Sequence, residues 1–433
     1  MRRVVITGIG IVSPLGIGAK AHWEALVAGA AGVRKIAAFD PSGFASQVAG
    51  EVPAYKINDF VPKHYRKATK VMARDIELAV IAADDAFKSS GLKSRAYTET
   101  PDFDGTRFGC NIGAGLISCD LNELTGAMTT ARDDASPNKL DLAKWGKDGM
   151  QQLTPLWLLK YLPNMLACHV TIVHELKGPS NTITCADASS HLAIGEAFRT
   201  IQRGNADMAI CGGAESKVNV MGLIRHSLLK RLTENNEEPG GAVRPFDEGA
   251  SGTAIAEGGG LLILEEYERA KARGATMYAE LVGFAASQDA YKITDPCPTG
   301  LSYGKAISKA LADANLPPAA VGLIIPHGIG IPAHDRAELA GLSTVFGAGL
   351  SRVPMAPIKG QIGNLAAGSG VDAATAVLAL HHGVIPPAVN TTKVAGDVGL
   401  NVSATARDIR ADVAVSSVYS LGGQNAALVF KKV

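Results

Sequence analysis

The sequence predicts an α/β fold made of two similar halves, and three observations support this prediction. Apolar runs typical of buried strands alternate with segments of helical spacing along most of the chain. The region from residue 278 repeats the order of strands and helices found before it. A β-branched strand at 181–186 runs directly into a helix at 188–203. This alternation is typical of mainly parallel sheets that are covered by helices.

The first elements combine a strand, a glycine-rich turn and a helix. We expect a strand at 3–7 that ends in the tight turn GIGIVSPLG. The GxGxxS spacing of this turn also occurs in dinucleotide-binding loops. Because Ser13 replaces the third glycine and no acidic residue follows about 20 positions on, a tight turn is the preferred interpretation. Residues 62–92 have helical spacing that ends at Gly91, and their first turns are basic.

The remaining elements follow from the same reasoning. Residues 117–150 are polar and mixed, and we expect no regular structure there. Strands are expected near 170–175 and at 206–212, around the helix at 188–203. Later in the chain, the pattern predicts a strand at 261–267 after the glycines 258–260, a start of the second half at 278–290, a helix at 302–314, a strand at 321–326, a glycine-rich turn at 360–370, a helix at 371–382, and strands near 411–417 and 425–431.

Composition excludes several classes of protein. The 433 residues include 42 Lys and Arg against 41 Asp and Glu, so a net charge of +1 gives no overall attraction to nucleic acid or to an anionic membrane. With 47% hydrophobic and 19% charged residues, bulk disorder is excluded. Gly8 and Gly10 interrupt the apolar N-terminal stretch, which argues against a signal peptide. Six cysteines without a C-x-x-C pair fit a reducing cytoplasm.

The most informative segment is GPSNTITCADASSHLAIGEAF, residues 178–198. A strand meets small residues and then a helix, which is the shape of a nucleophile elbow. A side chain at such a turn lies close to the helix N-terminal amides, which can activate a nucleophile and stabilise an oxyanion. In this sequence the turn carries Asp187.

Together with other motifs in the same order, this segment resembles the β-ketoacyl-acyl carrier protein synthases of the elongating type, the thiolase-fold condensing enzymes of fatty acid and polyketide synthesis. The resemblance is carried by VVITGIGIVSPLG, KGPS, ADMAICGGAES, RPFDEGASGTAIAEGGGLLILE, ARGATMYAELVGFAASQDAYKIT, PHGIGIPAHDRAE, APIKGQIGNLAAGSG and GGQNAALVF. It implies a thiolase-like fold with duplicated βαβαβ halves, about 1–256 and 257–433, in a five-layer α/β/α/β/α arrangement that forms a dimer.

Two departures from the family pattern concern its catalytic residues. The family carries a nucleophilic cysteine where this chain has Asp187, and Cys185 lies two residues too early to replace it unless the turn is remodelled. The second of the family's two histidines is replaced by Asn364. The first is kept as His327, and Lys359 is also kept. Asn364 can still donate a hydrogen bond to a carbonyl.

Other positions concern support and gating of the site. Asp335 and Glu338 are retained as site-supporting residues. Both threonines of the family's HGTGT motif are replaced, by Ile329 and Ile331, and this removes two hydroxyls near the phosphopantetheine arm. Where the family has a gating aromatic residue, this chain has Leu421, directly before Gly422 and Gly423. Asp187, Leu421 and Gly422 form the expected oxyanion and gating region.

The replacement by Asp187 changes the expected function. A carboxylate that attacked a thioester would form a mixed anhydride of higher energy, whereas a thiolate exchanges nearly isoenergetically. At a helix N-terminus the carboxylate should stay ionised and oppose a malonyl carboxylate, unless burial raises its pKa above 7. The chain therefore resembles a chain-length factor, the silent partner of an active ketosynthase.

Two other functions stay open. The chain could be a homodimeric ketosynthase-like acyltransferase, decarboxylase or thioesterase that uses Asp187, His327 and Asn364. It could also be an acyl-binding scaffold without turnover. A neighbouring gene for a paralogue with intact Cys, His and His would favour the partner role.

The resemblance also implies partners, and it implies no metal or diffusible cofactor. The expected partners are an acyl carrier protein, which delivers its phosphopantetheine arm, and either a paralogous ketosynthase subunit or a second copy of the chain. A basic run is a candidate docking site for the acidic carrier and could otherwise be a solvated face; it includes Lys63, Arg66, Lys67 and Lys70. His334 and Asp335 suggest a hydrogen-bond cluster and not a metal site.

Overall fold

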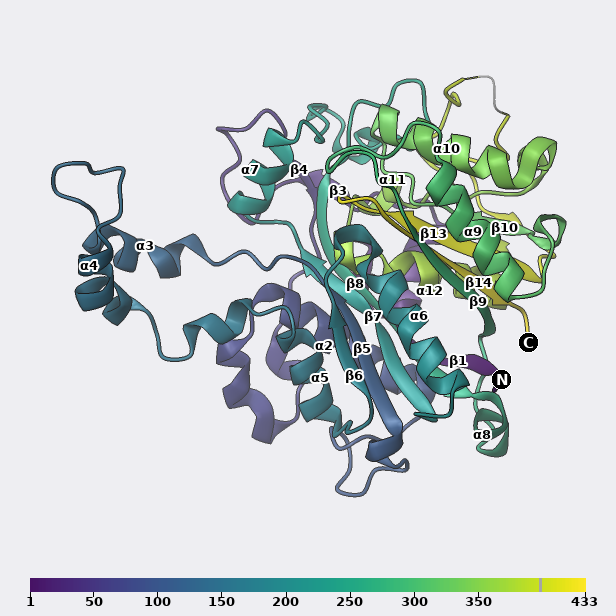
Figure 1. Ribbon diagram of the computed structural model, residues 1–433, viewed down its shortest axis with the longest axis horizontal. Coiled ribbons are helices and arrows are strands. Elements are labelled where there is room, and N and C mark those ends of the chain that lie inside the picture. Colours follow the sequence, from purple (N-terminus) through teal and green to yellow (C-terminus); the bar gives the residue numbers. More distant parts are fainter. Residues whose placement is uncertain (397–398) are drawn as a thin grey trace.

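Two sets of strands form the framework of the computed structural model, which describes residues 1–396 and 399–433 (Figure 1). The large sheet has the order β10-β13-β14-β9-β1-β8-β7-β5-β6. Its N-terminal strands are β1 (Val4–Ser13), β5 (Phe108–Ala114), β6 (Ser180–Ile183), β7 (Met208–Ser216) and β8 (Ile255–Glu266). Its C-terminal strands are β9 (Ala279–Gln288), β10 (Leu323–Ile325), β13 (Val413–Tyr419) and β14 (Gln424–Lys431). β1 pairs with both β8 and β9 and thereby joins the halves.

Helices and the two halves of the sheet form five layers. α2 (Arg74–Ser90) and α5 (Met165–His174) cover the outer face of the N-terminal strands, and α9 (Leu301–Asp313) and α10 (Pro332–Phe346) cover that of the C-terminal strands. Between the halves lie α6 (Ser189–Gln202) and α12 (Gly370–His382), which contact strands of both. The central core cluster joins apolar residues of β1, α6, α12 and β14. The predicted α/β/α/β/α arrangement is confirmed.

The pairing of the strands differs from the prediction of mainly parallel sheets. β5 is parallel to β6 and β7, and β10 is parallel to β13, but β1–β8, β7–β8, β13–β14 and β9–β14 are antiparallel. The sheet is therefore mixed. One physical reason lies in the connections, since a short turn such as the one between β13 and β14 can only join antiparallel neighbours. β8 spans residue 256 and pairs with β1 and β7, so it belongs to the N-terminal half of the sheet.

The prediction of a turn after residue 7 was wrong, because β1 continues through Gly8 and Gly10 to Ser13. A Cβ atom at Gly10 would lie 1.8 Å from the carbonyl oxygen of Ala82 in α2. The glycine therefore allows α2 to pack closely on the strand. The glycines 258–260 likewise lie inside β8 and not before it.

The expected strand near 170–175 is part of helix α5, so that prediction was also wrong. Leu166, Val170 and Val173 are buried on one face, which is helical spacing. The short apolar run was mistaken for a buried strand because periodicity alone separates the two poorly over so few residues.

The predicted helix at 62–92 consists of two elements. A 3-10 helix spans Lys63–Val71, and α2 begins at Arg74 and ends at Ser90, directly before Gly91, which has a φ of 70°. Met72 and Ala73 between them are extended. No residue of Lys63–Val71 is fully buried, so little packing favours its continuation as an α-helix.

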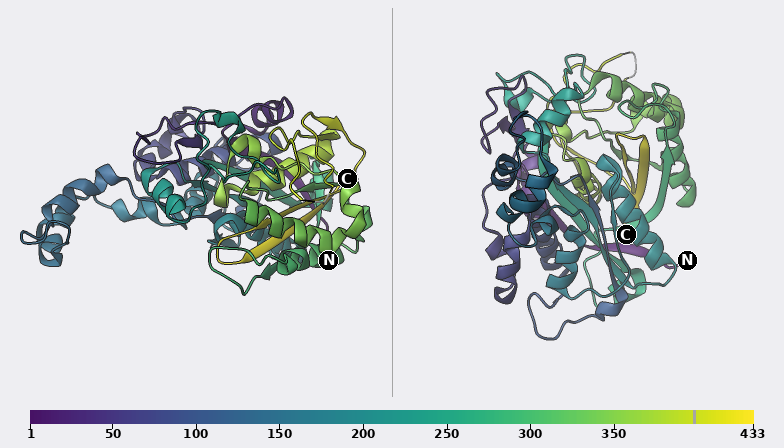
Figure 2. Two further views of the ribbon diagram at one scale, coloured as in Figure 1. Left: turned by 90° about the horizontal axis from the view of Figure 1, so that it is seen from above. Right: turned by 60° about the vertical axis from the view of Figure 1, so that its left-hand side comes forward.

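Residues 117–150 form an ordered arm, where we expected no regular structure. It contains α3 (Leu121–Thr130), α4 (Leu142–Lys144) and a π-helical turn at Trp145–Gly149, and it extends away from the body of the molecule (Figures 1 and 2). The side chains of Asp120 and Asp141 cap the two helices. Ala127, Ala131 and Gly149 are buried where the arm packs on itself.

The other predicted elements are found within a few residues of their expected positions. The remaining elements are α1 (Ala19–Val27), α7 (Val220–Leu228), α8 (Tyr267–Ala272), α11 (Lys359–Ile362), and the short strands β2 (Gly16–Ile17), β3 (Val33–Lys35), β4 (Val48–Gly50), β11 (Val384–Ile385) and β12 (Arg407–Asp408). Among the described residues, no helix has both the length and the apolar character needed to span a bilayer.

Candidate active site

The elbow lies where β6 meets α6. A 3-10 turn, Ala186–Ala188, connects them, and Ala186 has a φ of 45°, which is strained for a residue other than glycine. Gly113 of β5 lets the first turn of α6 approach, because a Cβ atom there would lie 2.5 Å from the carbonyl carbon of Ser189. The turn buries the Asp187 side chain next to the helix N-terminus. The predicted elbow geometry is therefore present.

Asp187 faces His327 across the two halves of the fold. Its Oδ1 lies 3.7 Å from His327 Nε2, and its backbone carbonyl accepts a hydrogen bond of 2.6 Å from Ser369 Oγ. Burial would raise the pKa of Asp187, but His327, Arg231 and the Asn364 amide outweigh it and hold the pKa below its usual value. The carboxylate is therefore ionised at neutral pH, as the sequence predicts.

The imidazole of His327 is neutral. Burial lowers its pKa well below the usual value, although Asp187 opposes this shift. Both ring nitrogens are buried without a hydrogen-bond partner among the described residues, and the ring packs edge-on against Tyr419 at 4.7 Å between centroids. A neutral imidazole can donate one hydrogen bond to an entering group and accept another.

Asp335 and Glu338 support the loop that carries His327. Glu338 accepts hydrogen bonds from the backbone N–H groups of His327 (2.7 Å) and Gly328 (2.8 Å). Asp335 accepts from the N–H groups of Ile329 (3.2 Å) and Gly330 (3.2 Å). Both carboxyl groups act on the backbone of the loop, which agrees with their expected supporting role.

The stability of this loop should depend on pH. Burial raises the pKa of Asp335 to about 8 and that of Glu338 to about 7, although the backbone N–H groups oppose the shift. Because these native-state values exceed the unfolded ones, both groups stabilise the native state at acidic pH, and this contribution is lost as the pH rises through 7 to 8. The free energy of unfolding in urea should fall by roughly 1–3 kcal/mol between about pH 5.5 and 8.5.

A matched pair of variants tests this expectation. Glu338→Gln should flatten the pH dependence of the unfolding free energy, because its carboxyl no longer titrates. Glu24→Gln, at an exposed position of α1, should leave the slope unchanged. An equally steep slope in the Glu338→Gln protein would show that this carboxyl is not responsible.

Lys359 and Asn364 also lie at the site. Lys359 is fully buried and forms an ion pair with Asp372, which is fully buried as well. Asn364 is 3% exposed and its side-chain oxygen accepts a hydrogen bond of 3.1 Å from the N–H of Ala366. Its amide contributes to the low pKa of Asp187. The structure thus brings together four residues that the sequence predicts, from both halves of the chain.

Three predicted residues of the site remain: Cys185, Leu421 and Gly422. Cys185 precedes the turn, and burial raises the pKa of its thiol, so it is not a ready thiolate. Leu421 and Gly422 lie in the turn between β13 and β14. The aromatic contact with His327 is made instead by Tyr419, at the end of β13. Tyr419 lies outside the motifs that carry the resemblance, so the sequence alone does not mark it as a site residue.

Two further buried polar residues escaped the sequence analysis. Arg231 is 4% exposed, and its charge contributes to the low pKa of Asp187. His226, on α7, has its pKa lowered to about 3 by burial and then by Arg231. Neither lies in a motif of the family, so only their burial, which a sequence does not show directly, marks them as site residues.

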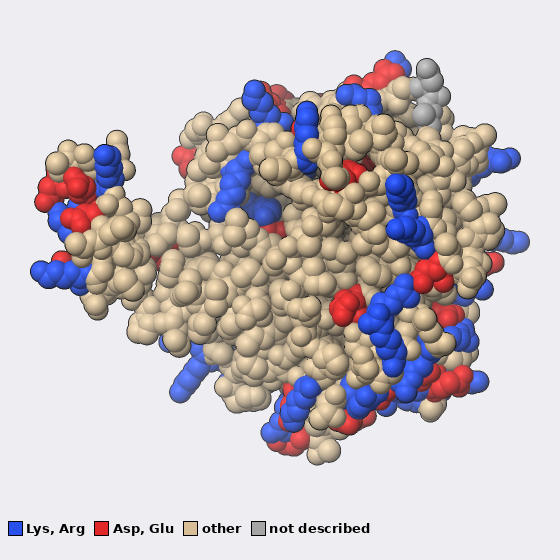
Figure 3. Space-filling view, viewed as in Figure 1, with Lys and Arg blue, Asp and Glu red and all other residues tan. Residues whose placement is uncertain are grey.

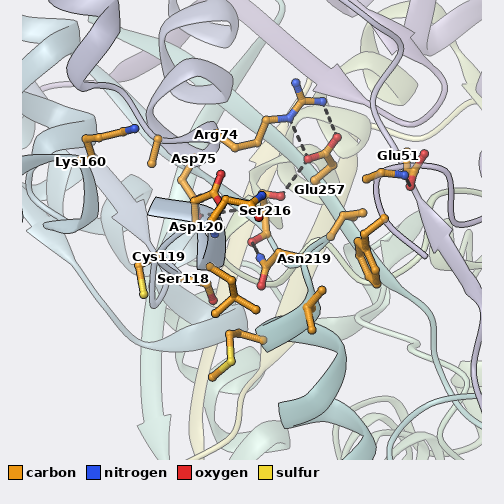
Figure 4. Close-up of a pocket in the computed structure, with 18 of the residues that line it drawn as sticks. Glu51, Arg74, Asp75, Ser118, Cys119, Asp120, Lys160, Ser216, Asn219 and Glu257 are labelled. Carbon is orange, nitrogen blue, oxygen red and sulfur yellow. Dashed lines mark hydrogen bonds and ion pairs between the residues drawn. The ribbon is translucent and has the colours of Figure 1, made fainter. Parts of the chain in front are cut away.

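A separate cleft of about 1000 Å³ lies between the arm and the body (Figure 4). Asp187, His327 and Asn364 do not line it. Its main charged groups satisfy one another: Arg74 forms a bidentate pair with Glu257 (2.6 and 3.0 Å), and Ser216 Oγ donates to Glu257 (2.8 Å). The described residues hold no cluster of three potential metal ligands.

The site can therefore bind and polarise but lacks an activated thiol. An ionised carboxylate, a neutral imidazole and a side-chain amide face one another in a buried space. The imidazole and the amide can donate hydrogen bonds to a carbonyl oxygen. The carboxylate can accept a proton, and its reaction with a thioester is energetically unfavourable.

Comparisons with known proteins agree with this architecture. Residues 1–270 match the model of the β-ketoacyl synthase N-terminal domain, and residues 278–392 match that of the C-terminal domain. The 3-oxoacyl-[acyl-carrier-protein] synthase 2 of Vibrio harveyi is 34% identical over 100% of this chain and 99% of its own length. The protein of the same name from Vibrio cholerae is 32% identical with the same coverage.

Solved structures give the same result. The ishigamide ketosynthase/chain length factor matches with a TM-score of 0.85 and 27% identity, covering 100% of this chain and 99% of the other. A type II PKS acyl-carrier protein in complex with its ketosynthase matches with a TM-score of 0.84, 26% identity and the same coverage. A β-ketoacyl synthase from Burkholderia phymatum STM815 matches with a TM-score of 0.86 and 28% identity, covering 100% of both chains. The chain belongs to the β-ketoacyl synthase family and has its thiolase-like fold.

Proposed function

We propose that this chain is a non-condensing subunit of chain-length-factor type, which pairs with an active ketosynthase in fatty acid or type II polyketide biosynthesis. The observation that carries the proposal is the ionised, buried Asp187 at the tip of the elbow, where the family resemblance leads us to expect a cysteine. The nearest thiol in the sequence, Cys185, has a raised pKa. Thioester exchange therefore has no suitable nucleophile at this elbow.

The edge of the large sheet at β6 is suited to pairing with a partner subunit. β6 is the last strand of the large sheet, and its residues, SNTI, are exposed or half-buried. They include neither a charge nor a proline that would prevent pairing with another strand. Charged side chains are sparse on the part of the surface over α5 and β6 (Figure 3). This surface suits a second thiolase-like chain.

The surface of the arm also indicates a partner subunit. Large apolar side chains are exposed along it and at its base: Leu116, Leu121, Met128, Leu140, Leu142, Met150, Leu156 and Leu158. Such a concentration of exposed apolar residues typically marks a protein interface. The ketosynthase/chain length factor among the solved relatives supports a paralogous ketosynthase as the partner. The acyl chain would then arrive on the phosphopantetheine arm of a carrier protein.

Co-expression tests the assignment. The chain should be purified together with each paralogous ketosynthase encoded in the same genome and examined by native mass spectrometry. A one-to-one heterodimer with one of them is the expected result. Exclusive formation of homodimers in the presence of every candidate would contradict the proposed role.

One observation favours a second candidate function. The 3.7 Å separation of Asp187 and His327 would allow a homodimeric acyltransferase, decarboxylase or thioesterase in which Asp187 is a general base and Asn364 polarises the thioester. This candidate predicts that the purified homodimer turns over malonyl- or acyl-thioesters by itself. It also predicts that Asp187→Ala and His327→Ala each abolish that turnover.

Docking of the carrier protein should involve the basic helix Lys63–Val71. Lys63, Arg66, Lys67 and Lys70 are all exposed there, which suits an acidic partner. Charge reversal by Lys63→Glu with Arg66→Glu should weaken carrier binding about tenfold, measured by surface plasmon resonance at low salt. The matched control, Lys305→Glu with Lys309→Glu on α9, should bind normally. Equal affinity of both double variants would remove this surface as a docking site.

A further inference from the structure

Arg231 is a buried cation that the family motifs do not account for. It follows α7, where its N–H donates to the carbonyl of His226 at 3.1 Å and its own carbonyl accepts from the N–H of Thr253 at 2.9 Å. The neighbouring Gly252 donates to the carbonyl of Gly330 at 3.0 Å. Gly330 belongs to the loop that carries His327, so these backbone contacts place Arg231 beside the candidate active site.

The guanidinium of Arg231 has donors that the described residues do not satisfy. Nε and Nη1 are buried without a hydrogen-bond acceptor, and the residue is 4% exposed. A guanidinium is charged at any relevant pH and has five N–H donors. Leaving such donors buried and unpaired is costly, so an unpaired arginine in a protein interior indicates a site for an accepting group.

The charge of Arg231 acts on the candidate active site. It contributes to the low pKa of Asp187. The pKa of His334 is lowered to about 4, mainly by burial and next by the charge of Arg231. Two other cations near the elbow, the half-buried Lys217 and the buried Lys359, have carboxylate partners: Lys217 pairs with Glu215, and Lys359 pairs with Asp372. Among the described residues around the elbow, Arg231 is the cation without such a partner.

The surrounding polar atoms are also free to meet a ligand. Asp187 Oδ1 and both ring nitrogens of His327 are buried and unpartnered among the described residues. The negative charge of Asp187 would repel an anion, but Arg231 offsets it within the same cluster. An entering carboxylate could accept charge-assisted hydrogen bonds from Arg231, whereas an uncharged acyl group offers only a weaker acceptor.

We propose that Arg231 makes the elbow a binding site for acyl groups that end in a free carboxylate. Arg231 is thus a specificity-determining residue: it selects such groups over uncharged ones of the same size. The inference rests on the proposed function only in that the acyl group arrives as a carrier-bound thioester. It requires no chemistry at Asp187.

Two pantetheine thioesters test the inference, because malonyl and acetoacetyl groups are alike in size and differ in a terminal carboxylate against a methyl ketone. Isothermal titration calorimetry of the chain, in the assembly in which it is purified, should show malonyl-pantetheine binding at least about tenfold more tightly than acetoacetyl-pantetheine. Arg231→Met should reduce this preference to within about twofold. Asp187→Asn, which removes the repelling charge, should strengthen malonyl binding.

The control is Arg225→Met, at a half-buried arginine of α7 whose guanidinium donates to Ser118 Oγ at 2.9 Å. This variant should keep the wild-type preference for malonyl-pantetheine. Any binding site on a partner subunit is the same in all variants, so it cannot cause a difference between them. Equal binding of both thioesters by the wild-type protein would overturn the inference, and this result does not depend on the folding of a variant. An unchanged preference in Arg231→Met would overturn it too. If the chain forms only a homodimer and that homodimer prefers malonyl-pantetheine, the result refutes the proposed partner and leaves this inference intact. If the chain forms a heterodimer that lacks the preference, the result refutes this inference and leaves the proposed partner intact.

Discussion

Replacing Lys359 by methionine should destabilise the chain by about 3–5 kcal/mol, the typical cost when one partner of a buried ion pair is removed. Lys359 and Asp372 are both fully buried and pair with each other between α11 and α12. Without the lysine, the Asp372 carboxylate keeps no cation in contact, and burial then raises its pKa further. Urea unfolding at a fixed protein concentration measures the loss.

The double variant Lys359→Met with Asp372→Leu is the control for this prediction. It removes both charges and replaces them with apolar groups of similar shape, so it should recover most of the stability lost in the single variant. If the double variant is as unstable as Lys359→Met alone, the loss comes from packing of the lysine stem and not from the uncompensated carboxylate.

Condensation by the proposed heterodimer should not depend on Asp187. Alanine at this position should leave the condensing rate within about twofold, whereas alanine at the nucleophilic cysteine of the partner subunit should lower it at least about a thousandfold. The reason is that an ionised carboxylate at the elbow forms no useful acyl intermediate. The rate is measured with purified pairs, an acyl carrier protein and a malonyl carrier protein.

Cys185→Ala is the matched control within the same elbow. Its thiol has a raised pKa and precedes the turn, so this variant should also condense at the wild-type rate. A large loss in Cys185→Ala would mean that the turn rearranges and that this chain has its own nucleophile. A large loss in Asp187→Ala alone would favour the enzymatic alternative.

Much of the candidate site could be predicted because its residues lie in ordered family motifs. Asp187 lies between a predicted strand and a predicted helix, and His327 follows a predicted strand. Lys359 and Asn364 are located by the motif APIKGQIGNLAAGSG alone. The five layers followed in the same way from the resemblance. The backbone N–H groups of the loop that carries His327 donate hydrogen bonds to Glu338 and Asp335, which explains how these carboxyl groups support the site.

The remaining features depend on tertiary contacts that periodicity does not encode. β1 continues through Gly10 because α2 packs on it there, and the arm is ordered by capping aspartates and by its own small core. The short apolar run of α5 fits a strand or a helix equally well until its neighbours are known. Arg231 lies among ordinary basic and apolar residues, and only its burial distinguishes it.

If this chain is a non-condensing subunit, its elbow carries no acyl group. Intact-protein mass spectrometry of the purified pair, taken after brief incubation with an acyl carrier protein thioester, measures this. We expect the mass of one acyl group to be added to the ketosynthase partner and none to this chain. An acyl adduct on this chain, located by peptide mapping at Asp187 or Cys185, would contradict it.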